Sequence, residues 1–110
     1  MNMTVEELNG ISRIALVGKL DAQGAEAVEL QFTAITGHRD RVAIDLGAVE
    51  YIASMGIRIL VMAGKTMARR GGKLVLFGTS EAVAKVLTAS GLTEIMPLVG
   101  AWDAAVAAIG

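Results

Sequence analysis

Few side chains in this sequence could carry out chemistry. His38 is the only histidine and cysteine is absent, so thiolate chemistry is excluded and a zinc or transition-metal site lacks ligands. His38 lies in a polar run, residues 37–41. A general base or a phosphocarrier is conceivable there, although a solvated loop residue is the simpler interpretation. We expect no metal and no cofactor.

Two carboxylates form the next candidate. Asp45 and Glu50 lie near the carboxyl end of a predicted parallel strand, where α/β proteins bind ligands. A carboxylate pair could perform acid–base catalysis, whereas solvated strand-end carboxylates are the simpler interpretation. No nucleophile–base–acid set and no glycine-rich nucleotide motif accompanies them, because the glycine pair at 71–72 precedes a strand. We expect a protein that is not an enzyme.

The elements that must position these residues alternate strands with helices. Asn9-Gly10 separates two β-rich runs and predicts a hairpin, because both residues accept positive φ. Pro97 places the last strand at a sheet edge. Strands are predicted at residues 4–8, 11–17, 41–46, 73–77 and about 95–99.

Helices are predicted between these strands from apolar spacing and from cap residues. Asp21 is a predicted N-cap of the first helix, and Ser80 of the third. Gly91 fits the left-handed position after a helix. The helices are expected at about residues 22–37, 55–70, 81–90 and 102–109. This order predicts a single α/β domain over residues 1–110, with a mixed sheet that opens with an antiparallel hairpin and continues largely parallel, and about four helices packed against it.

Composition excludes several functions. The chain has 10 basic and 11 acidic side chains and 4% aromatics, so nucleic acid is a poor partner. Charged residues interrupt every apolar stretch, so no membrane insertion is expected. The N-terminus does not resemble a secretory signal. The absence of cysteine fits the cytoplasm, which is the expected location.

Ser54 stands where an apolar strand and a loop, residues 42–53, give way to a helix. Serine is common there as an N-cap, which is the simplest interpretation. A helix N-terminus also favours negative charge, so the fold would tolerate a phosphate on Ser54. A partner docked on this surface would not tolerate it, since a phosphate adds about two negative charges that must be desolvated.

The helix that follows Ser54 has a distinctive outer face. Arg58, Lys65 and Arg69 are spaced by seven and four residues, so they share one solvated face. Met55 and Met62 fall on the same face. Their flexible side chains could form an adaptable docking surface or could fill gaps at the edge of the core.

The segment around Ser54 also carries a family resemblance. Ile44-Asp45-Leu46, followed at residues 51–57 by Tyr-Ile-Ala-Ser-Met-Gly-Ile, resembles the signature of STAS domains in bacterial anti-sigma-factor antagonists. Further matches follow the family's order over the whole chain, at Gly18-Lys19-Leu20-Asp21, Gly71-Gly72-Lys73-Leu74 and Ser90-Gly91-Leu92.

The resemblance implies a STAS-like fold and a regulatory function. It implies that an anti-sigma factor serine kinase binds the chain and phosphorylates Ser54, and that a serine phosphatase can reverse the mark. Together with the face of the helix that follows Ser54, the resemblance gives the expected partner-binding residues: Asp21, Ala53, Ser54, Met55, Gly56, Arg58 and Met62. Ala53 departs from the family's aspartate before the serine, which bears on the phosphoswitch. The alternatives are a STAS subunit of a transport ATPase complex or signalling scaffold without a switch, and a small enzyme or phosphocarrier.

Overall fold

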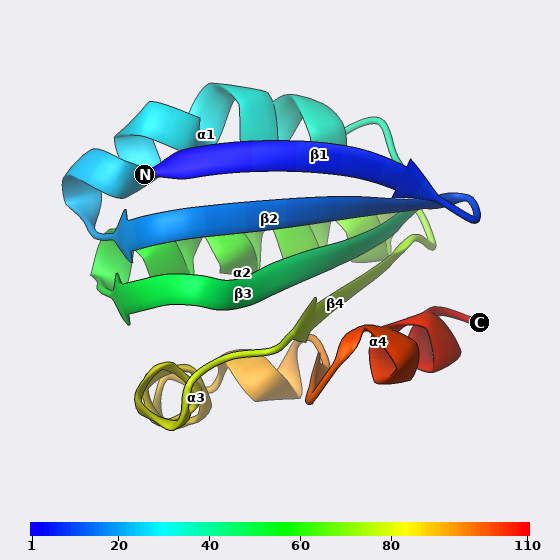
Figure 1. Ribbon diagram of the computed structural model, residues 1–110. Coiled ribbons are helices and arrows are strands. Elements are labelled where there is room, and N and C mark those ends of the chain that lie inside the picture. The colour runs from blue at the N-terminus through cyan, green and yellow to red at the C-terminus, as the bar shows by residue number, and fades with distance from the viewer.

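A five-stranded sheet in the order β1-β2-β3-β4-β5 runs through the molecule (Figure 1). The computed structural model describes residues 1–110. Its strands are β1 (Asn2–Leu8), β2 (Ile11–Leu20), β3 (Arg41–Ile52), β4 (Lys73–Phe77) and β5 (Leu98–Val99). β1 and β2 pair antiparallel and all other neighbours pair parallel. The predicted mixed α/β sheet is therefore confirmed.

The hairpin forms as Asn9-Gly10 predicts. Asn9 has φ 55° and Gly10 has φ 78°, and Leu8 pairs with Ile11 directly across the two-residue turn. Positive φ at both central positions gives a turn whose twist matches the twist of the strands.

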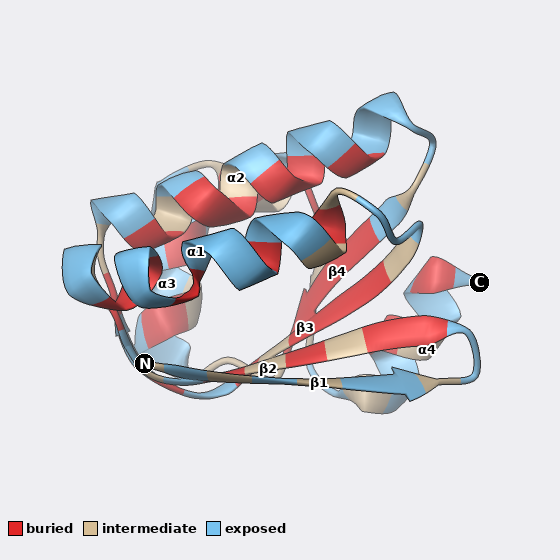
Figure 2. Cartoon of the chain, turned by 90° about the horizontal axis from the view of Figure 1, so that it is seen from above, coloured by how far each residue is buried: buried red, intermediate tan, exposed pale blue.

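Four α-helices pack against the sheet: α1 (Ala22–Thr36), α2 (Ser54–Arg69), α3 (Glu81–Ala89) and α4 (Trp102–Ile109). α1 and α2 cover one face side by side, and α4 lies on the opposite face against β4 (Figures 1 and 2). A short 3-10 turn, η1 (Leu92–Glu94), links α3 to β5. None of the helices has the length and apolar character that crossing a membrane requires.

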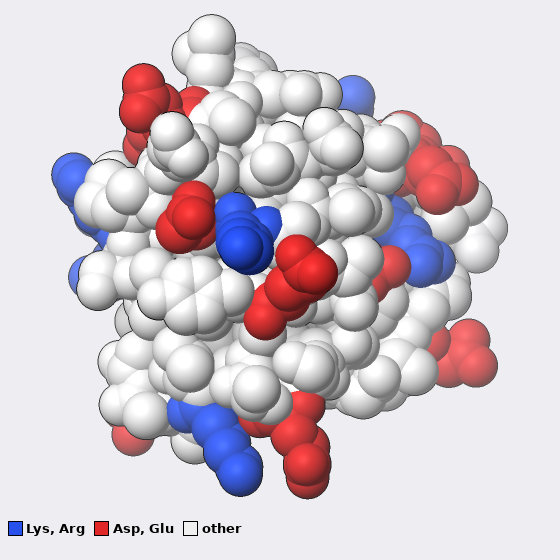
Figure 3. Space-filling model, turned by 60° about the vertical axis from the view of Figure 1, so that its left-hand side comes forward, with Lys and Arg blue, Asp and Glu red and all other residues white.

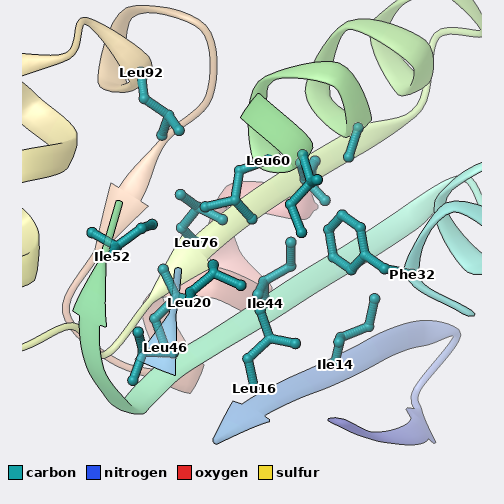
Figure 4. Packing of buried hydrophobic residues seen from close by; sticks show 14 of the residues in the cluster. Ile14, Leu16, Leu20, Phe32, Ile44, Leu46, Ile52, Leu60, Leu76 and Leu92 are labelled. Atoms are coloured by element: carbon teal, nitrogen blue, oxygen red, sulfur yellow. The ribbon is translucent and has the colours of Figure 1, made fainter. Parts of the chain in front are cut away.

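The main core lies between the sheet and α1 with α2 (Figure 4). Ile14, Ile44 and Leu76 project from three neighbouring strands toward Phe32 of α1 and Leu60 of α2. Each of these side chains is at most 1% exposed. Burying an aliphatic or aromatic side chain of this size stabilises the fold by about 1.5–3 kcal/mol, so this layer anchors both helices to the sheet.

The predicted caps are present. The Asp21 carboxylate accepts the Gly24 N–H at 2.8 Å, and the Ser80 hydroxyl accepts the Val83 N–H at 3.2 Å. Gly91 follows α3 with φ 82°, a conformation that glycine adopts without steric cost.

Four strands differ from their predicted lengths. β1 begins two residues earlier than predicted, and β2 continues to Leu20 instead of residue 17. β3 continues to Ile52 instead of ending at Leu46, because residues 48, 49, 51 and 52 still pair with β2 across two register shifts in the ladder. β5 has two residues instead of five, because Pro97 has no N–H to donate and the chain before it turns away into η1. The edge position that Pro97 predicts is confirmed.

Candidate functional site

The carboxyl ends of β2 and β3 lie beside the starts of α1 and α2. Leu20 pairs with Ile52 at the ends of the two strands, and the Ala53 N–H donates to the Leu20 carbonyl at 3.0 Å. Asp21 follows Leu20, and Ser54 follows Ala53, so the topology brings Asp21, Ala53 and Ser54 to one end of the molecule. Figure 3 faces this end, where a few charged side chains stand among mostly uncharged surface.

Ser54 is exposed and occupies the first position of α2. The N-cap position belongs to Ala53, which has extended dihedral angles (φ −122°, ψ 179°) and makes no side-chain cap hydrogen bond. The prediction that Ser54 is the N-cap is therefore wrong by one residue. The reason is that β3 continues to Ile52, so Ala53 is the last extended residue and the helix begins at Ser54.

The start of α2 favours an anion. No acidic residue lies in its first turn, and no side chain caps its free N–H groups. These groups and the helix dipole present partial positive charge to the solvent beside Ser54. A phosphate on the Ser54 hydroxyl would be stabilised there without rearrangement of the fold.

Replacing Ala53 by aspartate should stabilise the protein. The carboxylate would stand at the N-cap position and could accept an N–H of the first turn, which typically contributes about 0.5–2 kcal/mol relative to alanine. Urea unfolding would measure the gain. Ala101→Asp is a matched comparison, because Ala101 is the N-cap of α4 and also lacks a side-chain cap bond. Equal unfolding midpoints for Ala53→Asp and the wild type would contradict the N-cap assignment.

The outer face of α2 is basic and contains methionine. Met55 is 38% exposed and Met62 is 50% exposed. Arg58, Lys65 and Arg69 are exposed along the same helix, which has no acidic residue. Exposure of both methionines favours the docking-surface interpretation over burial at the edge of the core.

Met62 also borders a small groove between α1 and α2. The groove has a volume of about 80 Å³ and is lined in part by Phe32 and Ile59, with Thr33 and Thr66 at its sides. Part of the Met62 side chain therefore faces this groove, and the exposed half is free to contact another molecule.

Gly56 does not reach this surface. It is buried, and a Cβ placed on it would lie 2.5 Å from the Leu20 carbonyl oxygen and 2.6 Å from Leu20 Cγ. The expected direct partner contact through Gly56 is therefore not what the structure shows. Glycine is needed there because the first turn of α2 approaches the end of β2 closely.

The candidate catalytic residues are not brought together. Asp45 lies in the middle of the longer β3 and forms an ion pair with Arg13 at 2.9 Å, instead of standing free at a strand end. The Arg13 guanidinium also stacks near Phe77 and Trp102, at 5.2 and 5.0 Å from the ring centroids. This cluster, which the sequence did not indicate, holds the face of the sheet together beside α4.

His38 and Glu50 lie apart from that cluster. His38 is exposed after α1, and its Nδ1 is 2.8 Å from the Ala34 carbonyl oxygen. Glu50 is exposed near the end of β3 and lines a shallow polar hollow with Lys19 and Asp21.

Comparison with known proteins decides the family. The family model described as the STAS domain matches residues 2–105. The chain belongs to the STAS domain family, among the anti-sigma factor antagonists. These proteins are regulators and not enzymes, which confirms the expected absence of an enzymatic function.

Two relatives illustrate the similarity in sequence. BtrV of Bordetella bronchiseptica, assigned as an anti-sigma factor antagonist, is 31% identical over 98% of this chain and 94% of its own length. The anti-sigma-B factor antagonist of Listeria monocytogenes is 31% identical over 77% of this chain and 75% of its own.

Solved structures share the fold. An anti-sigma factor antagonist from Mycobacterium paratuberculosis superimposes with a TM-score of 0.89 at 27% identity, covering 98% of this chain and 92% of that one. A Thermotoga maritima protein assigned to the same class has a TM-score of 0.91 over 97% and 93% of the two chains. Its 17% identity shows likeness of fold alone.

Proposed function

We propose that this chain is an anti-sigma factor antagonist, acting in the cytoplasm as one domain, that binds an anti-sigma factor of the serine-kinase type through the surface around Ser54. Phosphorylation of Ser54 switches the binding off. The observation that carries the proposal is the exposed Ser54 hydroxyl in the first turn of α2, at a helix start with no side-chain cap. The names of the relatives in Bordetella and Listeria support the partner class.

The switch follows from charge and geometry. The kinase transfers the terminal phosphoryl group of ATP to the Ser54 oxygen, the hydroxyl proton passes to a base of the kinase, and ADP leaves. The phosphate adds about two negative charges to the surface that the partner must desolvate. The helix start stabilises these charges in the free protein. The partner therefore dissociates while the fold persists, and hydrolysis by a serine phosphatase restores binding.

We assign the partner surface to the exposed residues beside Ser54. Asp21 and Ala53 lie at the same end of the sheet and are partly exposed. Met55, Arg58 and Met62 continue the surface along α2. A flexible methionine beside a fixed positive charge suits a partner that presents apolar and acidic groups together.

Met62→Asp should weaken partner binding by more than about 1 kcal/mol, because an unpaired charge is poorly tolerated in the core of an interface. The change should affect folding little, since Met62 is 50% exposed. Titration calorimetry with the purified anti-sigma factor would measure the first effect, and thermal unfolding the second. Leu30→Asp is a matched control, because Leu30 is 87% exposed on α1 and lies outside the proposed surface. Unfolding of Met62→Asp would show that Met62 belongs to the core.

One observation favours a second candidate function. Ala53 replaces the family's aspartate directly before the serine, so the surface could bind a partner constitutively, as a scaffold or as a transporter subunit would. The STAS fold occurs in such a setting, since the chain superimposes on part of a mouse anion transporter with a TM-score of 0.72, covering 18% of that chain. Incubation with the kinase and ATP, followed by mass spectrometry, separates the candidates: phosphate on Ser54 supports the switch, and partner binding without phosphate supports the scaffold.

A further inference from the structure

We propose that the open edge of β4 binds an extended segment of a protein partner, which pairs with the sheet as an added strand. β5 pairs only with Leu76 and Phe77. The first three residues of β4, Lys73 to Val75, pair with β3 on one side and have no strand on the other (Figure 1). An open edge of this kind is a template for another chain.

Pro97 is the reason that this edge stays open. The Leu76 N–H donates to the Pro97 carbonyl at 3.0 Å. In a parallel ladder the next bond toward the start of β4 would run from the N–H of residue 97 to the Leu74 carbonyl, and proline has no N–H. The chain before Pro97 also turns away, because the Met96 N–H bonds to the Leu92 carbonyl at 3.1 Å.

Leu74 therefore offers both a donor and an acceptor. Alternate residues of a strand direct their N–H and C=O groups to the same side, so those of Leu74 point the same way as those of Leu76. β5 pairs with Leu76 and leaves Leu74 without a strand partner at this edge. An added peptide could accept the Leu74 N–H and donate to its carbonyl.

A groove of about 290 Å³ lies beside this edge. Gly64 and Ala68 of α2 line it on one face of the sheet, and Ala108 of α4 lines it on the other. Successive side chains of an added strand would point alternately toward these two helices. Ala68 and Ala108 are small and leave space for them, whereas the Met96 side chain already packs against Gly64, where an added Cβ would clash with Met96 Cε.

The groove also indicates the chemistry of its occupant. Among its ten lining residues only Lys73 is charged, and Lys73 is exposed and belongs to neither ion pair of the chain. The other lining residues are mostly apolar: Ile95 is 45% exposed, whereas Leu74 and Val75 are only 6% and 1% exposed. The occupant is an extended segment with apolar side chains and an acidic residue placed against Lys73. A helix would not serve, because its own backbone groups are already paired.

This surface is separate from the one assigned to the anti-sigma factor. Met62 is the residue of that surface closest to Gly64 in sequence, but residues two positions apart are separated by about 200° around a helix. Met62 lines the groove against α1, whereas Gly64 lines the groove beside β4. The proposal therefore does not rest on the phosphoswitch, and both surfaces can be occupied at once.

A phage-displayed library of short random peptides, selected on the full chain, is the probe. Enriched peptides should be rich in β-branched and apolar residues and should carry an acidic residue. A synthetic enriched peptide at saturation should slow amide hydrogen exchange of Leu74 by about tenfold or more. Ala108→Phe, which fills the groove from an exposed position, and Lys73→Glu should each weaken peptide binding by about tenfold or more.

Matched variants keep the test decisive. Ala104→Phe on the same helix and Lys85→Glu on α3 lie outside the groove and should change the peptide Kd by less than about twofold. Thermal unfolding of each variant checks that it is folded, and Lys73→Glu carries the test if Ala108→Phe does not fold. Failure to enrich any peptide, enrichment of amphipathic helices, or peptide binding that is equal in the wild type and the groove variants would overturn the proposal.

Discussion

Ser54→Asp should weaken binding of the anti-sigma factor by about 2 kcal/mol or more, which is about thirtyfold in Kd. The substitution places a negative charge where the partner must desolvate the surface. The melting temperature should stay the same or rise slightly, because a carboxylate in the first turn of a helix typically contributes about 0.3–1 kcal/mol of stability. Titration calorimetry and thermal unfolding of the same preparation would measure the two effects.

Ser54→Ala is the matched variant for this test. It should bind the anti-sigma factor as the wild type does and should take up no phosphate from the kinase and ATP. Its stability should also be close to that of the wild type, since Ala53 and not Ser54 occupies the N-cap of α2. Binding of Ser54→Asp with wild-type affinity would place Ser54 outside the interface. Absence of phosphate on wild-type Ser54, with binding intact, would leave the scaffold function as the better account.

Gly56→Ala should destabilise the fold by about 1–3 kcal/mol or more, as overpacking of a close contact does. The added Cβ would lie 2.5 Å from the Leu20 carbonyl oxygen, and that oxygen cannot move away freely because it accepts the Ala53 N–H. Relief of the clash requires α2 to move away from the end of β2. Such a movement would displace Ser54 relative to Asp21, so partner binding should weaken as well.

Gly100→Ala provides the control for Gly56→Ala. A Cβ on Gly100 would meet no atom within 4 Å, and its φ lies outside the left-handed region. Gly100→Ala should change the free energy of unfolding by less than about 0.5 kcal/mol. Urea unfolding of both variants compares the same chemical change at a crowded and an open position. Equal stability of the two variants would contradict the close packing of α2 on β2.

Local chemistry made much of this fold predictable. Asn9-Gly10, Asp21 and Ser80 each act within three residues of their own position, on a turn or a helix start. Such signals survive in the sequence because their partners are near neighbours. The alternation of apolar strands with amphipathic helices also predicted that the strands after the hairpin are parallel, since each pair of parallel strands needs a crossover connection.

The boundary between β3 and α2 was less predictable. Gly47 and Ala48 have little strand propensity, and β3 continues through them only because β2 is long enough to pair as far as Ile52. That extension makes Ala53 the last extended residue and moves Ser54 from the cap into the helix. A contact between segments thirty residues apart therefore decided what the Ser54 hydroxyl does.

The sequence by itself determined the mixed α/β sheet, its opening hairpin, the edge position that Pro97 requires and the family signature around Ser54. Each of these features depends on residues that are close in sequence or on an ordered set of short motifs. Only the tertiary structure decided that Gly56 of α2 is buried against Leu20 of β2, that Asp45 pairs with Arg13 and that Leu74 has no strand partner on one side of β4. The physical reason is that burial, ion pairing and strand pairing depend on contacts between segments that are distant in sequence, and local propensity carries no information about those contacts.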